Sequence, residues 1–279
     1  MTGKLTICGT PIGNLGDLSE RAAGALASAD VVFAEDTRRT GQLLAHLGVS
    51  VPMRSFFAGN ERARLELLRS ELGSGKSVVL VSDAGMPTIS DPGAAAINVA
   101  VEVAAEVAVV PGPSAVSTAL SVSGFNGDRF VFDGFLPRKG RDRAEAIHSI
   151  SIERRTTVIF ASPKRVVHDL ADLADELEAD RRLVVARELT KVFEEIWRGT
   201  IGEASQHWES EGTTKGEFTV VIEGAVAVEM SIDDAADAVR ALIAQGSSTS
   251  DAVRTVANAH GVGRSALYDR VLKDRSEPF

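Results

Sequence analysis

The stretch Ser82-Asp-Ala-Gly-Met-Pro-Thr-Ile-Ser-Asp-Pro-Gly93 lies between an apolar run, Val78–Val81, and an alanine-rich segment. It holds two glycines, two prolines and two aspartates, whereas a connection between a strand and a helix usually needs only about two to six residues. The prolines fix φ and restrict the preceding residues, so the segment is stiff, and the glycines let a ligand approach the backbone. Ligands of open α/β sheets bind at the carboxyl ends of strands. The sequence therefore predicts a ligand-binding loop after a buried strand.

The chain up to about residue 117 alternates short apolar runs with helical patterns. Strands are predicted over 5–8, 31–34, 78–81 and 107–110, and helices over 18–27, 41–47, 60–72 and 91–104. Asp17, with Glu20 three residues later, predicts a capping box at the start of the first helix. Such alternation is typical of an α/β fold with a largely parallel sheet covered on both faces.

A second set of apolar runs follows a proline-bracketed turn, 111–118. Strands are predicted over 130–132, 157–160, 183–186, 194–198 and 217–222, and helices near 142–151, 163–177 and 201–211. The later strands have few helices between them, which favours a mixed sheet. Because 279 residues exceed what one core needs, we expect two α/β domains, 1–117 and 118–228.

The remaining residues, 229–279, show three helical patterns and no strand pattern. Ser250–His260, a glycine turn and Arg264–Leu272 have the spacing of a helix-turn-helix. Two apolar helices joined by a glycine turn also make small helical bundles. The tail therefore predicts a small helical domain, with nucleic-acid contact only slightly favoured.

Composition bounds the class of protein. The net charge of −9 argues against indiscriminate binding to nucleic acid, although residues 138–143 carry four cations in six positions. The chain has no apolar run of transmembrane length, and its single cysteine, Cys8, lies in an apolar run where a buried small hydrophobe is expected. Metal-ligand spacings are absent, so no metal site is predicted, and the cysteine usage fits a reducing cytoplasm.

The first strand-to-helix turn reads Gly9-Thr-Pro-Ile-Gly-Asn-Leu-Gly16. It lacks the spacing of a dinucleotide fingerprint and of a phosphate-binding P-loop, so no NAD or ATP site is supported. Together with 82–93 and the rigid turn 110–115, it places three loops on one carboxyl edge of the sheet. That arrangement favours a pocket over three independent turns.

Several motifs occur in order: Gly9–Asn14, Glu35-Asp-Thr-Arg38, Ser82–Gly93, Pro111-Gly-Pro-Ser-Ala115, Gly134-Phe-Leu-Pro-Arg-Lys139, Arg187-Glu-Leu-Thr-Lys191 and Lys215-Gly-Glu-Phe218. Over residues 4–225 the chain resembles the ribosomal RNA small subunit methyltransferase I branch of the tetrapyrrole methylases. The resemblance implies S-adenosylmethionine bound in a cleft between two α/β domains, usually in a homodimer. It also implies transfer to the ribose 2′-hydroxyl of a decoding-centre cytidine in the 16S rRNA of the small ribosomal subunit. The implied cofactor contacts are Pro11, Asp83, Gly85, Met86, Ile89, Ser114, Ala115 and Ala161.

Carboxylates near these motifs are candidates for a general base or another catalytic role. The candidate catalytic residues are Glu35, Arg38, Asn60, Glu61 and Glu188, with Asp36 as a further possible base. Each carboxylate has a structural alternative, such as a helix cap or an ion pair with Arg38, Arg39 or Lys191, and Asn60 alternatively caps the helix that follows it.

Cations near the second-domain motifs are expected to grip RNA phosphates, because phosphate contacts dominate affinity and position the target. The candidates are Arg138, Lys139, Arg141, Arg143, Lys164 and Arg165. A solvated turn or ion pairs are the structural alternatives.

Two other functions stay open at this stage. A superfamily methyltransferase acting on a tetrapyrrole or another small molecule would share the sheet and the cofactor pocket, but would not need the basic cluster or the helical tail. A non-catalytic RNA-binding module would use the tail, yet the overall acidity and the three elaborate loops count against it.

Overall fold

The first sheet joins five strands in the order β3-β2-β4-β1-β5. Their bounds are β1 (Lys4–Cys8), β2 (Val31–Ala34), β3 (Met53–Ser55), β4 (Ser77–Val81) and β5 (Glu106–Val110). Every pairing is parallel, which confirms the predicted parallel sheet. The sequence pattern missed β3, because its three residues are only half-buried and include an arginine.

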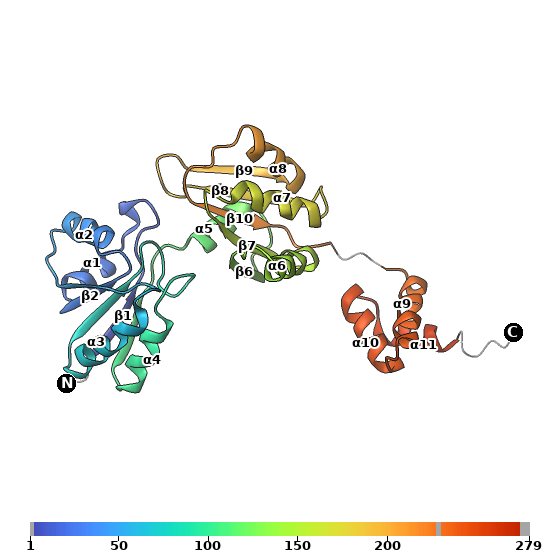
Figure 1. Cartoon of the computed structure of the whole chain (residues 1–279), viewed down its shortest axis with the longest axis horizontal. Coiled ribbons are helices and arrows are strands. Elements are labelled where there is room, and N and C mark those ends of the chain that lie inside the picture. The colour runs from blue at the N-terminus through green and yellow to red at the C-terminus, as the bar shows by residue number, and fades with distance from the viewer. Residues whose placement is uncertain (1–2, 227–229, 274–279) are drawn as a thin grey trace. The chain divides into compact units, whose positions relative to one another are not determined.

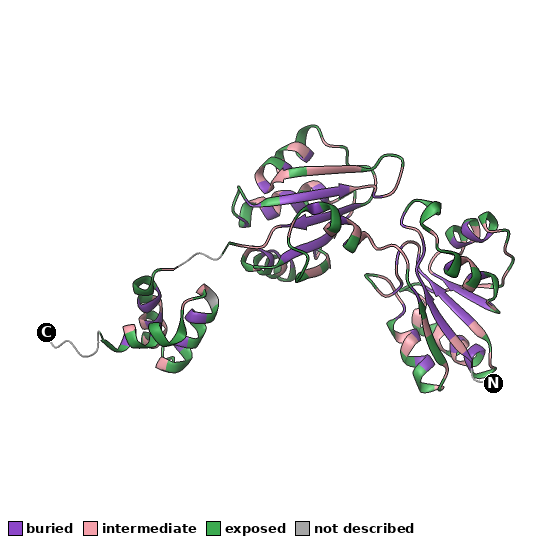
Figure 2. Ribbon diagram, turned by 180° about the vertical axis from the view of Figure 1, so that it is seen from behind, coloured by how far each residue is buried: buried purple, intermediate pink, exposed green. Residues whose placement is uncertain are grey.

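Helices cover both faces of this sheet (Figure 1). They are α1 (Glu20–Ala27), α2 (Thr37–His46), α3 (Glu61–Gly73) and α4 (Ala94–Glu102). On one face, Leu5 and Leu80 pack with Leu68 of α3 and Val99 of α4. On the other, Cys8, Val32 and Val79 pack with Leu26 of α1 and Leu44 of α2. Both faces of the central strands are therefore buried, which explains their continuous apolar runs (Figure 2).

Three predicted helix starts were wrong. Ser19, not Asp17, caps α1 through a hydrogen bond from the Ala22 nitrogen to its Oγ (3.1 Å), and Asp17 belongs to a preceding 3₁₀ turn, η1 (Leu15–Asp17). Helix α2 begins four residues early, because Asp36 accepts a hydrogen bond from the Arg38 nitrogen (2.8 Å). Helix α4 begins late, because Gly93 has φ +136° and the segment from Asp91 stays in the loop.

The second sheet has the order β6-β7-β10-β8-β9. Its strands are β6 (Phe130–Phe135), β7 (Thr156–Ala161), β8 (Arg182–Arg187), β9 (Glu195–Thr200) and β10 (Phe218–Ile222). Strand β6 runs parallel to β7, whereas the other pairings are antiparallel. The predicted mixed sheet is confirmed.

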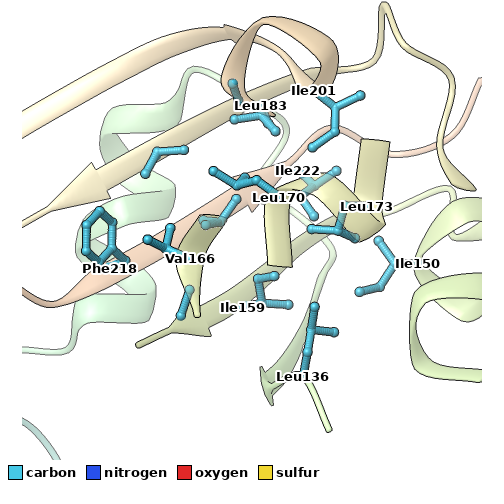
Figure 3. Packing of buried hydrophobic residues seen from close by; sticks show 14 of the residues in the cluster. Leu136, Ile150, Ile159, Val166, Leu170, Leu173, Leu183, Ile201, Phe218 and Ile222 are labelled. Atoms are coloured by element: carbon cyan, nitrogen blue, oxygen red, sulfur yellow. The ribbon is translucent and has the colours of Figure 1, made fainter. Parts of the chain in front are cut away.

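Two layers of helices enclose the second sheet. Helices α6 (Arg141–Ile152), α7 (Val166–Glu176) and α8 (Ile201–Ser210) cover one face, where Ile150, Leu170 and Ile201 pack against Ile159 and Leu183 (Figure 3). Helix α5 (Ala115–Ser123) covers the other face with Val116 and Ala119. Helix α5 follows directly from the third predicted rim loop, so it carries the chain from the first sheet to the second.

The computed structural model describes residues 3–226 and 230–273. The chain divides into two compact units, 1–223 and 224–279. Both sheets lie in the first unit, and a domain boundary at 117/118 stays a prediction. The predicted boundary between residues 228 and 229, and the last residues of the predicted helical domain, 274–279, lie outside the described residues. Within the described ranges, no helix is long and apolar enough to cross a membrane.

The second unit contains the three predicted helices: α9 (Ile232–Ala244), α10 (Thr249–His260) and α11 (Arg264–Lys273). Val239, Val253, Leu267 and Val271 are buried in its core. Ser231 and Ser248 cap α9 and α10, and Gly261 ends α10 in a left-handed conformation, which allows the short turn into α11. The helical pattern of the tail is confirmed.

Candidate active site

Three loops are locked together at the carboxyl edge of the first sheet. The backbone nitrogen of Thr10 donates to the Gly85 oxygen (2.9 Å), and the Gly85 nitrogen donates back to the Thr10 oxygen (3.0 Å). The Gly9 nitrogen donates to the Val110 oxygen (2.9 Å). A Cβ on Gly9 would lie 2.6 Å from the Gly112 Cα, so the two backbones can meet only because both residues are glycine.

A cavity of about 360 Å³ opens beside these loops. Its volume is within the usual range for a small-molecule site. Seven of the eight residues predicted to contact a cofactor line it: Asp83, Gly85, Met86, Ile89, Ser114, Ala115 and Ala161. Pro11 instead lines a neighbouring cavity of about 290 Å³. The cofactor role of all eight remains a prediction.

Much of the cavity wall comes from the second sheet and was not predicted from the sequence. Besides Ala161, the residues on this side are Phe135, Phe160, Ser162, Pro163, Ala186, Leu189 and Glu217–Thr219. They come from the carboxyl ends of β6, β7 and β8 and the start of β10. In sequence most of them look like ordinary strand ends, and the Gly134–Lys139, Arg187–Lys191 and Lys215–Phe218 motifs were the signals that marked this edge.

Three carboxylates lie on the first-sheet side of the cavity: Glu35, Asp83 and Asp91. The Asp83 nitrogen donates to Glu35 Oε2 (3.2 Å), and Asp83 Oδ1 accepts from the Asp36 nitrogen (2.9 Å). The guanidinium of Arg39 also lines the cavity and lies 3.6 Å from Asp83 Oδ2. This side of the cavity therefore carries more negative than positive charge and suits a cationic ligand.

Burial and mutual repulsion change how two of these groups titrate. Burial raises the pKa of Asp91 to about 6, and repulsion from Glu35 adds to the rise. Burial also raises the pKa of Glu35, against the hydrogen bond that it accepts from Asp83. Carboxyls with raised pKa values in a cavity are typical of binding and catalytic sites. Asp91 was not among the predicted site residues, although it is the second aspartate of the 82–93 loop.

Arg38 is not among the residues that line the cavity. Its guanidinium pairs with Asp36 (2.7 Å), and this hydrogen-bonded pair lowers the pKa of Asp36 to about 2. Asp36 also caps α2. The structural alternative for Asp36, a cap combined with an ion pair, is confirmed.

Asn60 and Glu61 each hold a loop: Asn60 the segment before α3, and Glu61 the end of the 82–93 loop. Asn60 Oδ1 accepts from the Phe57 nitrogen (2.9 Å), and its Nδ2 donates to Ser55 Oγ (3.0 Å). Asn60 occupies the N-cap position of α3 without a side-chain capping bond. Glu61 Oε1 accepts from the Gly93 nitrogen (3.1 Å), which ties α3 to the end of the 82–93 loop. Both side chains therefore support the loops and do not line the cavity themselves.

Glu188 belongs to a strained turn next to the cavity. Its φ is +51°, and its Oε1 accepts from Lys191 Nζ (2.7 Å) and from the Glu217 nitrogen (2.9 Å). Burial tends to raise the pKa of Glu188, but these hydrogen bonds hold it below its usual value. The predicted alternative of a pair with Lys191 is confirmed. The carboxylate fixes a turn whose neighbours, Leu189 and Glu217, do line the cavity.

The predicted RNA-binding cations fall into two groups. Arg138, Lys139 and Lys164 are exposed and form no ion pair with any residue in the described parts of the chain. Arg141 is exposed but pairs with Glu145 (2.5 Å).

The other two cations, Arg143 and Arg165, are bound to groups within the protein. Arg143 is only 8% exposed and pairs with Asp169 (2.9 Å) and Asp172 (2.6 Å). Arg165 donates to the backbone oxygen of Arg138 (3.2 Å). The prediction that Arg143 grips RNA was wrong, because a buried and paired guanidinium is not available to phosphate. Arg165 supports the loop that carries Arg138.

Family models and relatives of known name match this chain over most of its length. The family model "Tetrapyrrole (Corrin/Porphyrin) Methylases" matches residues 4–205, and "RsmI C-terminal HTH domain" matches residues 230–275. A relative from Synechocystis sp., named ribosomal RNA small subunit methyltransferase I, is 41% identical over 97% of this chain and 98% of its own length. The chain belongs to the ribosomal RNA small subunit methyltransferase I family. A relative of the same name from Mycobacterium tuberculosis is 42% identical, covering 99% of this chain and 97% of its own.

The ribosomal RNA small subunit methyltransferase I family shares its fold with enzymes of other names. Cobalt precorrin-4 methyltransferase superimposes with a TM-score of 0.59 at 18% identity, covering 79% of this chain and 94% of that one. Uroporphyrin-III-C-methyltransferase from Thermus thermophilus gives 0.57 at 18% identity, covering 78% and 94%. At this identity the likeness establishes the tetrapyrrole methylase fold alone. Membership in a methyltransferase family does imply a methyl donor.

Proposed function

We propose that this protein transfers a methyl group from S-adenosylmethionine to the 2′-hydroxyl of a decoding-centre cytidine in 16S rRNA. The observation that carries the proposal is the cavity between the two sheets, which is acidic on its first-sheet side and adjoins loops with exposed cations on its second-sheet side. Relatives covering almost the whole chain are named as methyltransferases of small-subunit ribosomal RNA, which supports RNA as the acceptor. The cytidine and its 2′-oxygen come from the family resemblance.

The charged, polar and apolar residues that line the cavity suit S-adenosylmethionine. When bound, this cofactor supplies a methyl group on a positively charged sulfur. The carboxylates of Asp83, Glu35 and Asp91 suit its positive charges, and the 82–93 and 110–115 loops offer backbone groups to its polar parts. Apolar side chains such as Leu189 and Phe218 suit its adenine ring.

An acceptor hydroxyl must lose its proton as it is methylated. Glu35 and Asp91 are the cavity carboxylates whose pKa values are raised toward neutrality, so each is suited to accept that proton. A positioned base contributes about 10²–10⁴-fold, and holding the two reactants in place contributes more, about 7–11 kcal/mol in favourable cases. Positioning by the three locked loops is therefore expected to be the larger contribution.

Exposed cations next to the cavity are suited to hold the RNA. Arg138 follows Phe135 by three residues, and Lys164 directly follows Pro163, and both Phe135 and Pro163 line the cavity. Lys139 extends the same loop, and Arg141 is exposed at the start of α6. Cations placed this way neutralise phosphates without reading sequence.

We infer a homodimer from the exposed edge of the first sheet. Strand β5 is an edge strand, and its Val107 and Val109 are 42% and 56% exposed. These side chains line an apolar groove together with Pro87 and Ile89 of the binding loop. A second copy would cover this groove and brace the loop. Light scattering on the wild type and on Val109→Asp tests this interface. We expect a dimer for the wild type and a monomer for the variant.

We place the enzyme in the cytoplasm, where small ribosomal subunits are found.

The proposed function is tested by incubating the protein with small ribosomal subunits from cells that lack it and with methyl-labelled S-adenosylmethionine. We expect the label in 2′-O-methylcytidine after digestion of the RNA to nucleosides. Label in another nucleoside would replace the proposed target. Cofactor binding without label in RNA would reject the RNA substrate and favour a tetrapyrrole or another small-molecule acceptor.

A further inference from the structure

Phe135 is an exposed aromatic side chain that forms part of the cavity wall. It is the last residue of β6, it lines the cavity, and it is 55% exposed. The next residue, Leu136, is the one that fills the second core, so the ring of Phe135 is not needed for that packing. An exposed ring beside a ligand cavity offers one apolar face to a flat ligand.

The ring of Phe135 packs against Phe160, which is itself packed against a third phenylalanine. Its centroid lies 5.4 Å from that of Phe160 on β7, at an interplanar angle of 57°. Phe160 in turn contacts Phe132 edge-on, with centroids 4.9 Å apart. Three phenylalanines from two adjacent strands thus form one cluster, and its outermost ring faces the cavity. Such packing fixes the orientation of Phe135 before any ligand arrives.

An irregularity in β6 creates this cluster. Phe132 and Phe135 are three residues apart, so in a regular strand they would point to opposite faces of the sheet. The register with β7 shifts between Phe132 and Gly134, and Gly134 has φ +65°. A bulge adds one residue to the strand, so both rings reach the face that carries Phe160. Bulges of this kind often direct a side chain at the edge of a functional site.

Unpaired cations lie close to this ring in the chain. Arg138 and Lys139 follow it in the loop after β6, and Lys164 lies in the loop after β7, directly after the cavity residue Pro163. An exposed aromatic ring next to cations is the combination by which proteins hold single-stranded RNA, because bases stack on the ring and phosphates pair with the cations. A polar cofactor tail would need neither.

We propose that Phe135 stacks on the base of the nucleotide to be methylated and thereby holds its ribose in the cavity. The proposal rests on the proposed function and adds a residue that positions the acceptor. With the base on Phe135 and the phosphates on Arg138 and Lys139, the ribose is directed toward the side of the cavity that holds Glu35 and Asp91. Stacking recognises any base, so cytidine selection would come from other contacts.

The test compares Phe135→Leu with the wild type and with Phe135→Tyr. Leucine keeps apolar packing against Phe160 but removes the aromatic face, whereas tyrosine keeps that face. Stacking on an aromatic side chain contributes about 1–3 kcal/mol per base, so kcat/KM for small subunits should fall roughly tenfold to hundredfold in Phe135→Leu. It should stay near the wild-type value in Phe135→Tyr. The Kd for S-adenosylmethionine, measured by calorimetry, should be unchanged in both.

Phe130→Leu is the matched control. Phe130 lies at the other end of β6, is 40% exposed, and is not among the residues that line the cavity. It should leave both kcat/KM and cofactor binding unchanged, so a general effect of altering β6 would be visible.

Three outcomes would count against the proposal. Wild-type kcat/KM in Phe135→Leu would overturn it. A parallel loss of cofactor affinity would also overturn it, because the ring would then hold the adenine. If the wild type binds S-adenosylmethionine but labels no RNA, the proposed function fails first, and the role of Phe135 fails with it.

Discussion

The guanidinium of Arg165 donates two hydrogen bonds to the backbone oxygen of Arg138, each 3.2 Å long. The buried Arg143 donates from Nη1 to the neighbouring Pro137 oxygen (3.0 Å). Two arginines thus fix the loop on which Arg138 and Lys139 are exposed. The basic stretch 138–143 therefore contains both exposed cations and a buried structural cation. Substitutions of the two kinds should have different effects, on RNA binding and on stability respectively.

Arg143→Ala should destabilise the fold. Removing this cation leaves Asp169, whose side chain is 6% exposed, without one of its partners. Breaking a buried ion pair from one side costs about 3–5 kcal/mol. Urea denaturation should show a loss of that size, whereas Arg141→Ala, at an exposed pair with Glu145, should change the unfolding free energy by less than about 1 kcal/mol. Equal losses in the two variants would contradict the structural role of Arg143.

The double variant Arg138→Ala/Lys139→Ala should weaken RNA binding without affecting stability. Each lost phosphate contact should reduce the slope of log affinity against log salt by about one. Filter binding at several salt concentrations measures this slope, and the Kd for S-adenosylmethionine should not change. Arg129→Ala, an exposed cation just before β6, is the control. An unaltered salt slope in the double variant would remove these residues from the RNA surface.

Asp91→Asn should make the protein more stable at neutral pH. The folded-state pKa of Asp91, about 6, lies above its usual value of 3.8. Its favourable contribution is therefore complete below about pH 4 and is lost as the pH rises through 6. The wild type should lose this contribution between pH 4 and 7, and the variant should not. Chemical denaturation at both pH values measures the difference, and equal pH dependence in the two proteins would contradict the burial of this carboxyl.

The same substitution should slow methyl transfer. If the Asp91 carboxylate accepts the hydroxyl proton, the wild-type rate should rise as the pH increases through about 6. The rate of Asp91→Asn should be about 10²–10⁴-fold lower than that of the wild type. Single-turnover rates between pH 5 and 8 test this expectation. A wild-type profile that survives in Asp91→Asn but disappears in Glu35→Gln would assign the proton to Glu35.

Gly112→Ala should separate the loops that form the cavity. A Cβ at Gly112 would lie 2.7 Å from the Cα and 2.7 Å from the carbonyl carbon of Gly9, and both are backbone atoms that cannot rotate away. Cofactor affinity and thermal stability should both fall. Gly24→Ala is the contrast, because nothing lies within 4 Å of its Cβ in α1, and alanine should stabilise the helix by about 0.5–1 kcal/mol. Unchanged cofactor binding in Gly112→Ala would contradict the role of this close approach.

Much of the first sheet and its helices could be predicted from local pattern. The runs at Val31–Ala34 and Val78–Val81 are strands buried on both faces, so their composition alone indicates them. The 82–93 loop was predictable because its glycines and prolines mark a rigid segment after a strand. Strand β3 was not, since three half-buried residues carry too little pattern to indicate a strand.

Other parts of the site depend on contacts between distant segments. The burial of Arg143 depends on Asp169 and Asp172, more than twenty residues away on α7, so its sequence looked the same as that of its exposed neighbours. Phe135 reaches the cavity only through the bulge at Gly134. A regular alternation assigns this ring to the wrong face, and the register with β7 is not visible in the sequence.

The most direct measurement is the content of 2′-O-methylcytidine in 16S rRNA from cells that lack this protein and carry either the wild-type gene or Asp83→Ala on a plasmid. Nucleoside mass spectrometry should find the modified cytidine with the wild-type gene and lose it with an empty plasmid, with Asp83→Ala strongly reduced because the variant removes a cavity carboxylate. An unchanged amount of 2′-O-methylcytidine in cells without the protein would contradict the proposed reaction.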